Sequence, residues 1–251
     1  MQRYRRPARW FHAGIYVGVL ILLATGWWLL EGQEGSPSPL AQLTGMPDVS
    51  LHKLAGWALT GFALAGVLLG IRAIPSFVAE SLRLRRSELG WFRRWPAAVF
   101  TGRFGWHSGR FDPGQRFLNV LLILGLALLL GSGVGLVMVH GGPDFVVLNQ
   151  VHTWTTYPVT GLILGHVIVA SGILPGYRGV WRSMHLGGRL NARVAQRLWP
   201  AWSRDPGGRQ RTPAEAREAR GDPELPAAAP GPGRPPRGAN YFDLKNSRGG
   251  P

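Results

Sequence analysis

Long apolar runs alternate with polar, arginine-rich segments over the first 174 residues of the chain. Four of these runs have the roughly 17–25 residues that a helix needs to cross a bilayer. They lie at about 11–30, 52–74, 117–139 and 150–174. The pattern predicts an all-α membrane protein, a bundle of four transmembrane helices.

The composition changes after the fourth run. Residues 187–251 are rich in Arg, Pro, Gly and Ala, and such low-complexity segments bury too little apolar surface to fold. We therefore predict a membrane domain at 1–186 and a basic, disordered, cytoplasmic tail at 187–251. An arginine pair precedes the first run, but no small-residue cleavage site follows it, so we expect a helix there rather than a cleaved signal.

Lysine and arginine fall in alternate loops. The segment before the first run carries four Arg, the loop 72–116 nine, and the chain after 174 fourteen Lys and Arg. Loops 31–51 and 140–151 carry none, and Lys53 is the one basic residue near them. Because cytoplasmic loops are the basic ones, both termini are predicted to be cytoplasmic, in a bacterial inner membrane. The net charge of +15 follows this topology, which favours contact with anionic lipid and not with nucleic acid.

Four of the seven histidines fall at two depths. His52 and His152 lie near the outer ends of the second and fourth runs, and His12 and His166 lie nearer the inner side. His152 and His166 are 14 residues apart, which is about 21 Å along one helix and roughly 40° around it. Histidine inside a bilayer is costly and usually functional, and neutral imidazole is a good axial ligand for haem iron. We predict an outer haem held by His52 and His152 and an inner haem held by His12 and His166.

The chain has no cysteine. Disulfides, cysteine-bound iron–sulfur clusters and covalently attached haem are therefore excluded, and the haems should be b-type. The position of His12 also fits an alternative to a ligand role, a residue at the membrane–water interface beside Trp10. His140, at the outer end of the third run, is a rival ligand, whereas His107 and His185 are weaker candidates.

With these positions fixed, residues 5–185 resemble the gamma subunit of membrane-bound formate dehydrogenase, a di-haem cytochrome b. The resemblance rests on "RWFHAGIYVGVLILLATGWWL", "LHKLAGW", "GRFDPGQRFLNVLL" and the spacing of His152 and His166. In that family the four matching histidines bind two b haems in the same pairs.

The resemblance also implies partners and a substrate. A catalytic alpha subunit would oxidise formate in the periplasm, and an iron–sulfur beta subunit would pass electrons to the outer haem. These electrons would cross to the inner haem and reduce a quinone, menaquinone or ubiquinone, near the cytoplasmic face. The implied quinone site includes Asp112, Gly114, Gln115 and His166; the family often has Asn at the position of Asp112. The sequence there also reads as a helix start, with Asp112 as N-cap and Pro113 first.

Other functions remain open. Related di-haem b subunits serve hydrogenases and thiosulfate reductases, and the sequence does not separate them from a formate dehydrogenase subunit. A histidine-based proton or metal transporter predicts carboxylates inside the spans, and the apolar cores contain none. A simple membrane anchor would need no histidine.

Overall fold

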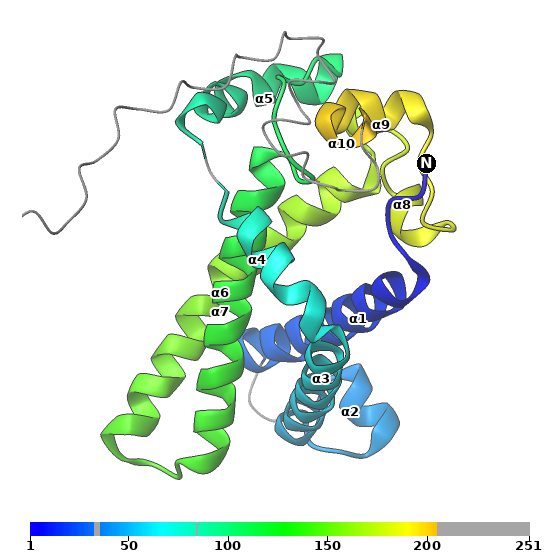
Figure 1. Cartoon of the computed structure of the whole chain (residues 1–251). Helices are drawn as coiled ribbons and strands as arrows, with labels where there is room; N and C mark the ends of the chain where they lie inside the picture. The colour runs from blue at the N-terminus through cyan, green and yellow to red at the C-terminus, as the bar shows by residue number, and fades with distance from the viewer. Residues whose placement is uncertain (33–35, 84, 205–251) are drawn as a thin grey trace, which may run out of the picture. The chain divides into compact units, whose positions relative to one another are not determined.

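The computed structural model describes residues 1–32, 36–83 and 85–204, and its main elements are helices. The four long ones are α1 (Arg6–Glu31), α3 (Asp48–Gly70), α6 (Pro113–Met138) and α7 (Gly142–Ser171), seen in Figure 1. The described residues form no strand, apart from an isolated β-bridge between Gln2 and Arg189. The predicted all-α class is confirmed.

Among the described residues, three helical segments are long and apolar enough to cross a membrane: α1, α6 and the segment Asp48–Ser81. The last of these is α3 continued through the 3₁₀ turn η1 (Ile71–Ala73) into α4 (Ile74–Ser81). A fourth span is present if α7 and the segment Pro175–His185, bent by 63° from it, count as one. In each of the three spans, at most 11% of the most apolar window is buried. Their apolar side chains therefore face outward, as expected of helices in contact with lipid.

Each long helix begins several residues before the apolar run that predicted it. At α6 the reason is visible: the side chain of Asp112 accepts a hydrogen bond from the backbone nitrogen of Gln115 at 2.8 Å, and Pro113 has no N–H to satisfy. The predicted N-cap is thus confirmed. Helix α7 runs without interruption through Pro158.

The long helices pack in two pairs, α1 with α3 and α6 with α7. Glycines allow the close approach in both, as small residues do in membrane helix pairs. A Cβ placed on Gly18 of α1 would lie 2.8 Å from Leu59 of α3, and one on Gly125 of α6 would lie 2.5 Å from Val159 of α7.

A separate core, here called the aromatic cluster, joins short helices with the start of the chain. Its helices are α5 (Leu89–Thr101), η3 (Pro175–Tyr177), α9 (Ala192–Leu198) and α10 (Pro200–Arg204). Its buried members are Val99, Tyr177, Leu190, Ala195, Leu198, Trp199 and Trp202. The guanidinium of Arg3 lies 4.2 Å from the ring of Trp199 and 4.4 Å from that of Trp202, a cation–π arrangement.

The aromatic cluster extends beyond the predicted domain boundary at residue 186. Disorder was expected from 187 onward, but α9 and α10 are helical because Leu198, Trp199 and Trp202 supply an apolar face that can be buried. The rest of the predicted tail, from 205 to 251, lies outside the described residues.

Candidate functional site

The four predicted ligand histidines form two pairs. The ring centres of His12 on α1 and His166 on α7 are 6.2 Å apart. Those of His52 on α3 and His152 on α7 are also 6.2 Å apart. The structure therefore brings together the pairs that the sequence suggested, and α7 contributes one member to each.

The separation fits an iron atom between two imidazoles. A metal–imidazole bond is about 2.0 Å long, and a ring nitrogen lies about 1.1 Å from the ring centre. Two such bonds on opposite faces of a macrocycle therefore put the ring centres about 6.2 Å apart. Both pairs have this spacing.

His52 and His152, the predicted outer pair, each lie within hydrogen-bond distance of a hydroxyl group. Nδ1 of His52 lies 2.8 Å from Oγ1 of Thr25 on α1. Nδ1 of His152 lies 2.9 Å from Oγ of Ser132 on α6. These bonds occupy Nδ1 and leave Nε2 as the nitrogen free for a ligand bond.

His12 and His166, the predicted inner pair, have a different environment. Nδ1 of His12 is buried without a hydrogen-bond partner among the described residues. The nearby aromatic ring is that of Tyr16, 5.8 Å from the ring of His12. The two candidate haem sites are therefore alike in spacing and unlike in hydrogen bonding.

The remaining histidines have other roles. His140 is exposed between α6 and α7. His107 is fully buried, and its Nε2 lies 2.8 Å from the carbonyl oxygen of Leu198. The ring of His185 packs edge-on at 5.9 Å against Tyr16. None of the three takes part in the two histidine pairs.

The predicted quinone residues lie at the start of α6. A Cβ on Gly114 would lie 2.7 Å from the Trp91 ring, so the indole covers the backbone there. Oε1 of Gln115 is buried without a hydrogen-bond partner among the described residues. Asp112 is buried beside them. In the part of the chain that the structure describes, no hydrogen bond connects these three residues with His166.

Burial raises the pKa of Asp112 above the ordinary carboxyl value. The hydrogen bond from Gln115 and the charges of His107, Arg3 and Arg116 act in the opposite direction. A carboxyl group in this environment can hold a proton nearer to neutral pH than an exposed one. That property suits a donor in proton-coupled chemistry.

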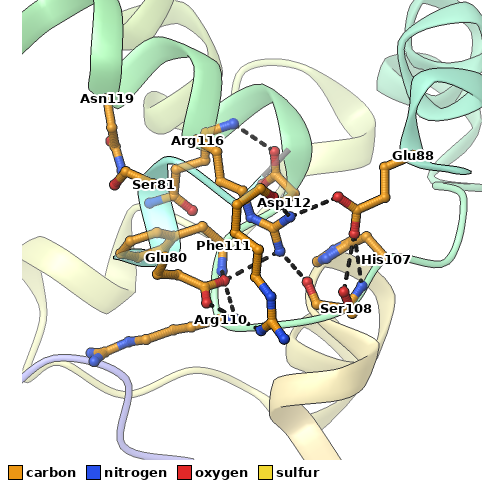
Figure 2. A network of polar contacts seen from close by, with 12 residues as sticks. Glu80, Ser81, Glu88, His107, Ser108, Arg110, Phe111, Asp112, Arg116 and Asn119 are labelled. Carbon is orange, nitrogen blue, oxygen red and sulfur yellow. Dashed lines mark hydrogen bonds and ion pairs between the residues drawn. The ribbon is translucent and has the colours of Figure 1, made fainter. Parts of the chain in front are cut away.

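A buried ion network, missed in the sequence analysis, supports the start of α6 (Figure 2). The guanidinium of Arg116 is fully buried and lies 2.7 Å from Glu88 Oε2 and 3.2 Å from Glu80 Oε1. It also donates to the carbonyl oxygens of Arg83, at 2.7 Å, and Ser108. The sequence analysis assigns the arginines of this loop to membrane topology alone. The signal that points to the network is the presence of two glutamates, Glu80 and Glu88, in so basic a loop.

The same carboxylates fix the loop that leads into α6. Glu88 accepts hydrogen bonds from the backbone nitrogen and hydroxyl of Ser108. Glu80 accepts from the backbone nitrogens of Arg110 and Phe111, as Figure 2 shows. The residues just before Asp112 are therefore held through backbone contacts, which position the first turn of α6.

Comparison with known proteins assigns the family. The model of prokaryotic cytochrome b561 matches residues 3–187, which include all four paired histidines and the long helices. No curated protein matches the sequence. The match covers well over half of the chain, so this membrane protein belongs to the prokaryotic cytochrome b561 family.

Proposed function

We propose that the protein is the cytochrome b subunit of a membrane-bound formate dehydrogenase. It would carry electrons from a periplasmic iron–sulfur beta subunit, served by a catalytic alpha subunit, to a quinone near the cytoplasmic face of the bacterial inner membrane. Family membership implies haem b. When bound, haem supplies one-electron transfer, and the chain supplies ligands, orientation and surroundings.

The observation that carries the proposal is the pair of equal histidine separations, 6.2 Å each. His52 and His152 would hold one haem, and His12 and His166 the other. Because both pairs use α7, a single helix sets the distance between the two sites. Two haem sites at different depths suit electron transfer across a membrane better than two sites at the same surface would.

The start of α6 is the proposed quinone site. Oε1 of Gln115 is buried without a hydrogen-bond partner among the described residues. This oxygen could accept a hydrogen bond from a quinol hydroxyl, and the amide nitrogen of the same side chain could donate to a quinone carbonyl. Asp112 is buried, and burial raises the pKa of its carboxyl group, so it could supply a proton to the reduced ring. Gly114 lets the Trp91 ring approach the backbone. His166 would connect this site with the inner haem.

The partner is proposed from the sequence resemblance. The related b subunits of hydrogenases and thiosulfate reductases remain alternatives, since the haem-binding helices do not depend on the distal enzyme. Membranes from the native host would separate these possibilities. Formate or hydrogen should reduce the b haems, and thiosulfate should oxidise quinol-reduced b haems, in each case only if the matching partner is present.

Haem content is the first test. The purified, fully loaded protein should release two b haems per chain in a pyridine haemochrome assay, without cleavage of a covalent bond. Formate should reduce them in native membranes but not in membranes from a strain that lacks the proposed catalytic alpha subunit. One haem per chain, or none, would contradict the di-haem reading.

A further inference from the structure

The hydroxyl of Thr25 has three neighbours, and they determine where its hydrogen points. Oγ1 lies 2.9 Å from the carbonyl oxygen of Ile21, 3.3 Å from that of Leu22 and 2.8 Å from Nδ1 of His52. A hydroxyl has one hydrogen to donate and two lone pairs. Carbonyl oxygens only accept, so the hydrogen must point to the α1 backbone. Otherwise two oxygens would face each other at 2.9 Å with no hydrogen between them.

It follows that the Thr25 oxygen acts as an acceptor toward His52. The hydrogen of that bond must therefore come from Nδ1 of the ring. Among the two neutral tautomers of imidazole, only the one with Nδ1–H satisfies this contact. Nε2 is then unprotonated and available to a metal.

The same arrangement recurs on another helix. Oγ of Ser132 lies 2.6 Å from the carbonyl oxygen of Leu128, 3.2 Å from that of Leu129 and 2.9 Å from Nδ1 of His152. The next residue is a glycine in both cases. A Cβ on Gly26 would lie 3.3 Å from His52 Cε1, and one on Gly133 would lie 3.2 Å from His152 Cε1. Each imidazole ring of the outer pair therefore lies against a hydroxyl-bearing residue and the glycine that follows it in the sequence.

We infer that Thr25 and Ser132 are positioning residues of the outer haem site, which fix both ligand tautomers and lower the reduction potential there. The inference rests on the proposed two-haem function. A histidine that donates Nδ1–H to an oxygen becomes a more basic ligand. A more basic ligand stabilises ferric iron relative to ferrous iron, and the potential falls.

The inner pair lacks this arrangement. Nδ1 of His12 is buried and unpartnered among the described residues, and no hydrogen bond of the described residues reaches His166. Judged by these hydrogen bonds alone, the outer haem has the lower reduction potential and is the stronger reductant of the two. The hydroxyls would then favour electron flow from the outer site to the inner one.

The test uses Ser132→Ala and Thr25→Val in the full-length, haem-loaded protein. Redox titration followed by optical spectroscopy measures both haem potentials. Each variant should raise the outer potential and leave the inner one unchanged, with a larger rise in the double variant. Transfer of the outer haem to a haem-scavenging protein should become roughly 10–100-fold faster. Thr60→Val is the matched control, because Thr60 makes the same bond to its own helix, to Gly56, at 2.7 Å.

Two conservative variants guard against misfolding. Thr25→Ser and Ser132→Thr keep the hydroxyls and should keep the wild-type potentials, so a raised outer potential in either would overturn the inference. Unchanged potentials in both Ser132→Ala and Thr25→Val would also overturn it, while leaving two haems in place. Fewer than two haems in the wild-type protein would instead overturn the proposed function, which keeps the two failures distinct.

Discussion

At the residue scale, the two histidines of α7 should serve different irons. His152→Ala should remove the outer haem and block electron entry from the partner, while added quinol still reduces the inner haem. His166→Ala should remove the inner haem and end quinone reduction, while the outer haem still accepts electrons. The reason is depth, because the two positions are about 21 Å apart along one helix. Haem content should fall from two per chain to one in each variant.

His140→Ala is the control for this pair of variants. His140 is exposed between α6 and α7, so both haems should remain. If this change bleached the outer haem and His52→Ala did not, the ligand assignment on α3 would be wrong.

A second residue-scale prediction concerns Arg116. Glu88→Gln removes one of its two carboxylate partners and leaves part of a fully buried charge uncompensated. The variant should lose about 3–5 kcal/mol of stability, measured by thermal unfolding in detergent against wild type. Arg83→Ala breaks the more exposed contact with Glu80, 3.7 Å long, and should cost less than about 1 kcal/mol. Equal losses would show that burial does not govern this network.

At the element scale, the contact between α6 and α7 depends on Gly125. Val159, which it faces, is buried and lies midway between the two α7 histidines. Gly125→Ala should push the helices apart and cost about 1–3 kcal/mol through overpacking, with earlier haem loss on heating. Gly131→Ala, on the same helix, meets nothing within 4 Å and should be neutral or slightly stabilising. Equal thermal haem loss in the two variants would contradict this packing role.

The elements of this structure could be predicted from the sequence to different degrees. The spans and the two histidine pairs follow from hydropathy and helix periodicity, which act over a few turns. The contact of Glu88 with Arg116, or of Thr25 with His52, depends instead on how separate helices meet. The helices α9 and α10 were missed because two tryptophans in a proline- and arginine-rich segment give a weak local signal. Their partner, Arg3, lies at the other end of the described chain.

At the scale of the whole molecule, the orientation in the membrane is testable. Residues 31–51 should lie outside, because they contain no Lys or Arg. A reporter enzyme that is active only in the periplasm should be active when fused after Ser36 and inactive when fused after Thr101. The reverse result would exchange the inner and outer assignments of both histidine pairs.

The contact of Arg3 with Trp199 and Trp202 constrains the order in which the protein can fold during its synthesis. Ribosomes add about 5–20 residues per second, so these tryptophans are made roughly 10–40 s after Arg3. During that interval the guanidinium has neither indole ring to lie against, and the backbone bonds between Met1 and Leu190 are still absent. The aromatic cluster can therefore close only after the last of the long helices has left the ribosome. Its closure therefore follows the synthesis of all four long helices.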